Sequence, residues 1–480
     1  MTAVRRLTGW GRTAPTVATV MPGDDVAGIA KAVRDPGRRG IIARGLGRSY
    51  GDAAQNAGGL VVDMTALDRV HQLDVDAATV TVDAGVSLDT LLRQVVPHGL
   101  WVPVLPGTRQ VTIGGAIAAD IHGGNHHTKG SFCNHVLELD LLTADGEVRT
   151  LTPDGPDAEL FWATAGGMGF TGVVVRATLR LERVETCYFV ADIERAECFD
   201  ELLERLHAND DQYTYSKTWF DSVTTGRHMG RGALIRGNFA RRDELPLRLR
   251  KDPLRFSAPQ VGRFPEVFPH GMLNRVTAHA FNEFYYRLNW PRTGAIQNLT
   301  AFYHVLDVTR DWNRAYGPRG FLQYQFVVPF GQEAILRRTM DAISGSGHMS
   351  CLNVLKRFGE GNEGPLSFPM PGWTLAVDMP VRPGLGRLCD ELDELVMEAG
   401  GRLYLAKDSR LPADRFARMY PRLDEWRKVR DAVDPERTFV SDLGRRLGLS
   451  RGVVRRLVWG RRCRGLGPVF GRWKSLGPFA

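Results

Sequence analysis

The chain of 480 residues lacks the features that mark several large classes of protein. Its six cysteines, at positions 133, 187, 198, 351, 389 and 463, form no C-x-x-C pair, which disfavours a zinc or dithiol site and indicates free thiols. No window approaches the roughly 20 apolar residues of a membrane-spanning helix, and no apolar run near the N-terminus resembles a signal peptide. Membrane contact is therefore expected to be peripheral, and export by the general secretory route is not indicated.

A basic face for nucleic acid is also missing, although the formal net charge is +8. Eight of the 62 Lys and Arg side chains lie in residues 451–480, which contain no acid, so the first 450 residues hold 54 basic and 54 acidic side chains. Nucleic-acid binders spread their charge over a working face. We therefore predict no nucleic-acid partner, and expect the basic tail to be either a disordered extension or a segment that lies on an anionic membrane surface.

The length and composition are those of a folded protein with more than one unit. Hydrophobic residues make up 43% and charged residues 24%, which excludes a disordered or fibrous chain. At roughly 150 residues per unit, 480 residues predict two or three units. Up to residue 186, short β-rich runs alternate with helical patterns at 25–33 and 87–96, where Ser87 can cap the helix. This mixture predicts an α+β fold.

The pattern of hydrophobic residues changes between residues 187 and 401. Runs such as 321–328 and 373–378 alternate in the manner of an antiparallel sheet. Residues 241–292 combine prolines and charges without periodicity, so we expect loops or mobile lids there and no regular element.

Three glycine-rich loops fall within about 130 residues of one another. The first, residues 41–52, has the spacing G-x-G-x-x-x-G and is not followed by the helix of a Rossmann unit; alone it is either an ordinary turn or an anion-binding nest. The second, residues 105–127, has Gly114 and Gly115 where backbone N–H groups could meet a phosphate. The third, residues 159–172, again sets glycines before a strand.

In this order the loops resemble the FAD-binding domain of the vanillyl-alcohol-oxidase superfamily, also called the PCMH type. Further motifs are similar to the branch of that superfamily that oxidises polyprenyl-phosphate-linked ribose, and they cover residues 5–449; they are residues 6–15, 43–52, 99–112, 312–318, 321–326 and 406–410. The resemblance implies a discontinuous FAD-binding domain at 1–186 and 402–450, a substrate domain built on a large antiparallel sheet at 187–401, and a basic extension at 451–480.

The resemblance also implies which residues surround FAD. They are Ala43, Arg44, Gly45, Leu46, Gly47, Arg48, Ser49, Tyr50, Gly51, Asp52, Ala53, Gly107, Thr112, Ile113, Gly114, Gly115, Ala119, Asp120, Ile121, His122, Val174 and Tyr404. Many members of the superfamily attach FAD covalently to a histidine in the first loop. Arg48 stands at the corresponding place here, so we expect a noncovalent flavin.

Catalytic roles are implied for Lys407, His122 and Tyr303, and substrate contacts for Lys356, Gln323, Gln325, Tyr303 and Lys407. Lys407 could stabilise the anion of the reduced flavin or, with a lowered pKa, accept the hydroxyl proton; the sequence leaves both roles open. On pattern alone, Lys407 is equally an exposed lysine, and Gln323 and Gln325 equally lie on a solvated strand face.

His122, His126 and His127 also suggest a metal cluster. They sit among glycines with no neighbouring Cys or Glu to complete a ligand set, so we predict no metal and a hydrogen-bonding role for His122. Two positions depart from the family: Thr374 and Ala376 replace an asparagine and a cysteine, and Cys351 is not that cysteine. Covalent inhibition by nitroaromatic compounds, known for the mycobacterial members, is therefore in doubt.

The implied reaction is oxidation of the ribose C2 hydroxyl of decaprenylphosphoryl-β-D-ribofuranose to the 2-keto sugar, with FAD taking the hydride. It is the first half of epimerisation to the arabinose donor of cell-wall arabinan, and an NADH-dependent reductase would complete it. The resemblance places such a protein peripherally on the plasma membrane, facing the periplasm. An alditol or aldonolactone oxidase, or a nonenzymatic binder that uses the basic tail, remain the alternatives.

Overall fold

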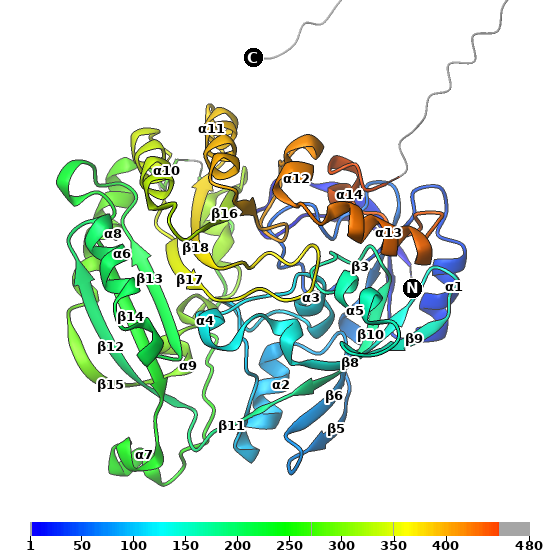
Figure 1. Ribbon diagram of the computed structural model, residues 1–480, viewed down its shortest axis with the longest axis horizontal. Helices are drawn as coiled ribbons and strands as arrows, with labels where there is room; N and C mark the ends of the chain where they lie inside the picture. Colours follow the sequence, from blue (N-terminus) through cyan, green and yellow to red (C-terminus); the bar gives the residue numbers. More distant parts are fainter. Residues whose placement is uncertain (1, 270, 349, 451–480) are drawn as a thin grey trace, which may run out of the picture.

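The structure is a computed structural model that describes residues 2–269, 271–348 and 350–450 (Figure 1). The two hypotheses for the basic tail concern residues outside these ranges. Within them, the chain forms small sheets with helices in its first 186 residues and one large sheet after that. The predicted α+β fold with a large antiparallel sheet is confirmed.

Two sheets dominate the described part of the first 186 residues. A four-stranded sheet has the order β1-β2-β4-β3, with parallel pairs β2–β4 and β3–β4, and a five-stranded antiparallel sheet has the order β5-β6-β10-β8-β9. The strands are β1 (Ala3–Leu7), β2 (Thr16–Pro22), β3 (Ile41–Arg44), β4 (Leu60–Asp63), β5 (Val70–Asp74), β6 (Thr79–Asp83), β7 (Leu100–Trp101), β8 (Val136–Leu142), β9 (Val148–Leu151), β10 (Val173–Arg180) and β11 (Glu182–Arg183).

Helices α1 and α2 form where the helical patterns predict them. The Asp25 side chain accepts hydrogen bonds from two backbone N–H groups of the first turn of α1, and Ser87 accepts one from Thr90 in α2. The leucines of α2 all point into the core. The helices of this part are α1 (Val26–Arg34), α2 (Leu88–Val95), α3 (Ile113–Ala118), α4 (His126–Lys129) and α5 (Ala158–Thr164).

The large sheet has eight described strands in the order β15-β12-β14-β13-β17-β18-β16-β19, all antiparallel. Every residue of β18 is buried, because α10 and α11 cover one side of this region (Figure 1) while the first part of the chain meets the other. The strands are β12 (Tyr188–Ala196), β13 (Tyr215–Phe220), β14 (Gly232–Phe239), β15 (Arg292–Asn298), β16 (Phe321–Pro329), β17 (Asn353–Phe358), β18 (Gly372–Pro380) and β19 (Arg402–Leu403).

The expectation of no regular element at 241–292 is wrong. Residues 275–288 form α8, a helix of 14 residues that Asn274 caps by accepting from the N–H groups of Val276 and Thr277. The hydrophobic pattern does not predict this helix because its buried face holds only Ala278 and Asn282. The helices here are α6 (Phe199–His207), α7 (Leu247–Arg250), α8 (Arg275–Leu288), α9 (Leu299–Phe302), α10 (Glu333–Gly345) and α11 (Leu385–Glu398).

After the large sheet, the chain returns to the first part. β19 pairs with β16, and the backbone N–H groups of Ile41 and Val440 then bond across to Thr438 and Ile41 at 3.0 and 2.9 Å. The helices of this segment are α12 (Ala413–Met419), α13 (Leu423–Val433) and α14 (Asp442–Arg446). The return agrees with a discontinuous first domain, whose exact limits stay a prediction.

The described residues contain no helix long and apolar enough to cross a membrane. Their five cysteines are all free.

Candidate active site

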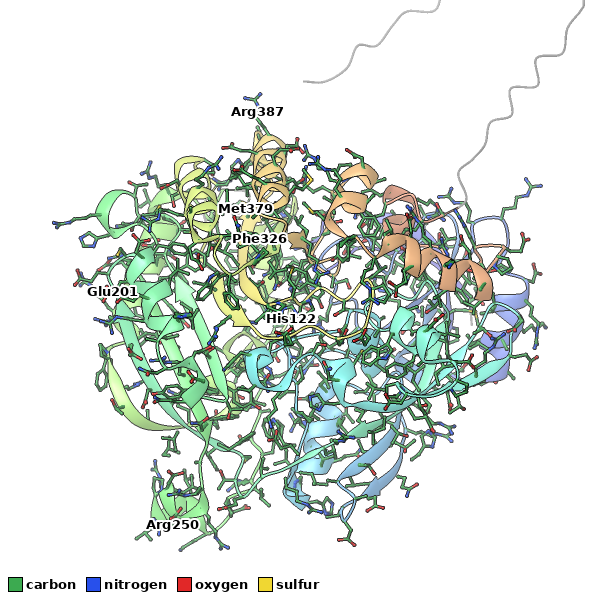
Figure 2. All side chains as sticks on the ribbon, viewed as in Figure 1. His122, Glu201, Arg250, Phe326, Met379 and Arg387 are labelled. Atoms are coloured by element: carbon green, nitrogen blue, oxygen red, sulfur yellow. The ribbon has the colours of Figure 1, made fainter. Side chains whose placement is uncertain are left out.

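A cavity of about 290 Å³ lies where the first part of the chain meets β16, β17 and β18. Figure 2 shows His122, one of its lining residues, at the centre of the molecule. Most of the predicted site residues line this cavity; they are Ala43, Arg44, Gly45, Leu46, Gly47, Arg48, Ser49, Tyr50, Gly51, Ala53, Gly107, Thr112, Gly114, Gly115, Ala119, Ile121, His122, Val174, Gln323, Gln325, Lys356, Tyr404 and Lys407. Residues from six separate stretches of sequence thus share one space.

Four predicted residues do not line the cavity. The Asp52 carboxylate pairs with Arg446 at 2.7 Å, and Asp120 is buried, accepting hydrogen bonds from Ser131 and Ser367 among others. Ile113 packs in the core. The Tyr303 hydroxyl accepts a hydrogen bond from the backbone N–H of Gly124, so it is turned toward the chain behind the cavity wall. These residues support the site and do not face it.

The first glycine loop offers unpaired backbone N–H groups. Within the described chain, no acceptor meets the N–H of Leu46, Gly47, Arg48 or Ser49. Gly47 has a φ of +66°, the left-handed conformation that turns successive N–H groups to one side. Such a nest binds an anion, and a pyrophosphate fits its chemistry.

In the second glycine loop, the predicted phosphate contacts of Gly114 and Gly115 are wrong. The N–H groups of Gly114 and Gly115 are already bonded, to the Ala84 carbonyl at 2.8 Å and to the Thr112 hydroxyl at 3.3 Å. They are therefore not free for a phosphate. Gly114 instead allows α3 to pack closely on Ala84, since a Cβ there would meet the Ala84 side chain at 3.0 Å.

Sequence reasoning missed two tryptophans beside the first loop. The Arg48 guanidinium lies 4.0 Å from the ring centroid of Trp10, which in turn contacts Trp312 edge to face at 5.7 Å. Both tryptophans line the cavity, and the buried Nε of Arg48 has no hydrogen-bond partner among the described residues. Trp10 and Trp312 belong to quoted motifs, but their spacing of 302 residues gave no signal that they would meet.

Two half-buried lysines also line the cavity. Burial lowers the pKa of Lys407 to about 7, opposed by Asp378 and aided by Lys356, and burial lowers the pKa of Lys356 to about 8. The Lys407 amine sits 3.8 Å from the ring centroid of Tyr50. Lys407 is therefore not the exposed lysine that its sequence alone allowed, and near neutral pH its amine exists in both protonation states.

Asp378 is a buried acid that the sequence did not single out. It lies directly across from Gln323 in the β16–β18 register, and its carboxylate accepts hydrogen bonds from the Gln323 amide at 2.5 Å and from the Tyr316 hydroxyl at 3.3 Å. Burial raises its pKa to about 7, although Gln323, Lys407 and Tyr316 oppose that shift. Gln323 thus connects this acid to the cavity wall.

Comparison with known proteins identifies the first part of the chain. Residues 16–152 match the family "FAD binding domain", and residues 378–447 match "D-arabinono-1,4-lactone oxidase". The chain is 54% identical to "Decaprenylphosphoryl-beta-D-ribose oxidase" of Mycolicibacterium smegmatis over 453 residues, 93% of this chain and 98% of the relative. The chain belongs to the decaprenylphosphoryl-β-D-ribose oxidase family.

Other relatives are more distant or shorter in their match. The chain is 26% identical to "L-gulono-1,4-lactone dehydrogenase" of Mycobacterium tuberculosis over 88% of this chain and 94% of the relative. It is 36% identical to "Cytokinin dehydrogenase 10" of Oryza sativa subsp. japonica, but over only 34% of this chain and 30% of the relative.

The cofactor of this oxidase-family chain is FAD, and the residues present fit it. The unpaired N–H groups at 46–49 suit a pyrophosphate, and Gly107 leaves open space on the wall, with no atom within 4 Å of where its Cβ would stand. The loop at 43–54, the end of α3 and the residues at 404–407 would hold the group between them.

Within the oxidase cavity, His122 is held by the large sheet. Its Nε2 lies 3.0 Å from the Gln325 amide nitrogen, which donates, so Nδ1 carries the proton and has no partner among the described residues. Burial, followed by the charge of Lys356, keeps the pKa of His122 well below its usual range. His122 is therefore a neutral hydrogen-bonding group.

The other two histidines bond to partners of their own. His126 Nδ1 accepts from the N–H of Gly359 at 3.2 Å, and His127 Nε2 contacts the Tyr213 carbonyl at 2.9 Å. Over the described ranges, no group of three or more His, Cys, Asp or Glu side chains is arranged to hold a metal ion.

The two family departures both face the cavity. Thr374 and Ala376 line it, and the Thr374 hydroxyl donates to the Phe326 carbonyl at 2.9 Å. Cys351 is buried elsewhere, against Val223 and Ala278, and burial raises its pKa to about 12. The lining residues include no cysteine.

Proposed function

We propose that this protein oxidises the C2 hydroxyl of decaprenylphosphoryl-β-D-ribofuranose to the 2-keto sugar. The observation that carries the proposal is a cavity lined by both an FAD-binding loop and two half-buried lysines, in a chain 54% identical to a decaprenylphosphoryl ribose oxidase along nearly its whole length. The product would be the intermediate of epimerisation to the arabinose donor of cell-wall arabinan.

Residues of this chain would accept the proton of the substrate hydroxyl and bind a substrate oxygen. FAD, when bound, accepts the hydride equivalent from the substrate carbon. The neutral form of the Lys407 amine would take the hydroxyl proton, since its pKa of about 7 makes that form abundant at neutral pH. Lys356, with the higher pKa of about 8, remains largely cationic and would hold a substrate oxygen. Gln323 and Gln325 would orient the sugar.

Asp378 is a positioning residue in this scheme, and replacing it with Asn is expected to change the pH dependence. Its negative charge raises the pKa of Lys407, so Asp378→Asn lowers that pKa below about 7 and shifts the acidic limb of the flavin-reduction rate to lower pH, by about one unit. Stopped-flow absorbance between pH 5 and 9 measures the limb. A limb that stays in place or moves to higher pH would contradict the coupling.

The substrate is tested by anaerobic bleaching of the flavin. A short-chain polyprenylphosphoryl ribofuranose is expected to reduce the enzyme fully, whereas xylitol and L-gulono-1,4-lactone leave it oxidised. One observation favours the lactone alternative: residues 378–447, which carry Lys407, match the arabinonolactone oxidase family. Bleaching by the lactone and not by the phosphoryl ribose would therefore replace the proposed substrate with an aldonolactone.

The remaining proposals concern attachment and partners. Arg48 stands in the first loop, and no histidine among the described residues lines that part of the cavity, which supports a noncovalent flavin. Acid precipitation should release the flavin into the supernatant.

A separate NADH-dependent reductase would consume the 2-keto product. A lipid-linked substrate supports work at the plasma-membrane surface, on the periplasmic side by family expectation.

A further inference from the structure

The solvent-exposed hydrophobic side chains are concentrated in one stretch of the chain. Ten of the fifteen large hydrophobic residues that are exposed among the described residues fall between positions 247 and 306. The same stretch is basic: residues 247–306 contain eight Arg and Lys against three Asp and Glu, whereas the rest of the first 450 residues carries a slight excess of acid. Exposed apolar groups and local positive charge therefore coincide.

Helix α8 lies within this stretch, and its large hydrophobic side chains face the solvent instead of the core. The positions that repeat every four residues along its outer face are Val276, Ala280, Phe284 and Leu288. Val276 is 78%, Phe284 62% and Leu288 54% exposed, and Trp290, just after the helix, is 55% exposed. A surface helix normally turns such residues inward.

The inner face of α8 is held by polar contacts. The buried Asn282 amide donates to the Asp221 carboxylate at 2.7 Å, and Glu283 pairs with Arg231 and Arg287, each at 2.6 Å. Glu283 is the only acid between residues 271 and 292, all of which are described, and these pairs occupy it. Arg275, His279 and Arg287 border the apolar stripe. The outer face therefore presents hydrophobic and cationic groups with no free acid.

The helix also connects to the cavity wall. Leu273, just before α8, packs on the aromatic cluster of Tyr50, Tyr316 and Phe321, and its carbonyl accepts a hydrogen bond from Arg382. Tyr50 lines the cavity. Figure 1 shows α8 at one end of the molecule, opposite α1.

We propose that the outer face of α8, with Trp290, is the surface by which this protein docks on an anionic lipid membrane. Aromatic and aliphatic side chains enter the boundary between headgroups and acyl chains, and the bordering arginines face lipid phosphates. This surface, and not the basic tail, then brings the cavity to a lipid-linked substrate. The inference rests on the proposed function for the identity of that substrate, but the docking itself does not depend on it.

The test is co-sedimentation of the full-length holoenzyme with vesicles of phosphatidylcholine and phosphatidylglycerol. The double variant Phe284→Ser/Leu288→Ser is expected to lower the partition coefficient at least about tenfold. The matched control Val4→Ser/Val17→Ser, which removes two exposed valines from β1 and β2, is expected to bind as the wild type does. Vesicles of phosphatidylcholine alone should bind the wild type more weakly.

Two results would overturn the proposal. One is unchanged binding by the α8 variant, above all if Arg455→Gln/Arg456→Gln in the tail abolishes it. The other is a wild-type dimer in sedimentation without lipid that the α8 variant converts to monomer, since the face would then cover a second copy. Reduction of each variant by a soluble short-chain substrate should match the wild type; if no variant and no wild type is reduced, the proposed function fails while the docking result stands.

Discussion

Replacing Lys407 with methionine is expected to slow reduction of the flavin by substrate about a thousandfold. Methionine keeps the length of the side chain but removes the amine that lies over Tyr50 in the cavity. Since burial holds the pKa of Lys407 at about 7, the wild-type amine can take a proton or carry a charge, and methionine can do neither. Anaerobic stopped-flow absorbance measures the loss, with the flavin spectrum confirming that the cofactor is still bound.

Lys217 supplies a matched control. It is likewise half-buried, desolvation lowers its pKa to about 8, and its amine donates to the Phe302 carbonyl, yet it does not line the cavity. Lys217→Met should reduce stability while changing the reduction rate less than about tenfold. Equal rate losses in both variants would mean that buried positive charge in general, and not the amine of Lys407, accounts for the effect.

Arg446→Met is expected to lower the free energy of unfolding by about 3 kcal/mol and to weaken FAD binding. The Arg446 guanidinium bonds to both Asp52 and Asp408 at 2.7 Å. Because these groups are largely buried, removing the guanidinium leaves two carboxylates without a cation to balance their charge. Asp52 ends the first glycine loop and Asp408 follows Lys407. Thermal unfolding followed by flavin fluorescence reports both effects.

The exposed pair between Arg427 and Asp424 serves as the comparison. Asp424 is 92% exposed, so Arg427→Met should change stability by less than about 0.5 kcal/mol and leave FAD affinity intact. If Arg446→Met melts as the wild type does and keeps its flavin, the pairing of the two loops through this arginine is not what holds them.

Local signals predicted much of the first part of the chain. The cap at Ser87 predicted the start of α2, because a cap acts within one turn of its helix, and the helical pattern at 25–33 predicted α1. The three glycine loops predicted a shared site, and the structure brings them to one cavity. The polar pairing of Gln323 was beyond prediction, since it depends on the register in which Asp378 lies opposite it across two strands.

Several of the predictions that failed also depend on contacts between residues that lie far apart in the sequence. The occupied N–H groups of Gly114 and Gly115 depend on Ala84 and Thr112, which sequence spacing does not relate to them in space. Tyr303 turns toward Gly124, a contact 179 residues away in sequence. Helix α8 was missed because the hydrophobic pattern reports burial, and this helix exposes its apolar side.

The parallel contact between Ile41 and Phe439 has a consequence for biosynthesis. A ribosome releases the first glycine loop early, but the segment around Phe439 beside β3 and the arginine that pairs with Asp52 lie about 400 residues later. The loop therefore lacks these two contacts until nearly the whole chain has emerged. Capture of the cofactor is thus one of the last steps of folding, and an interrupted chain should leave the ribosome colourless.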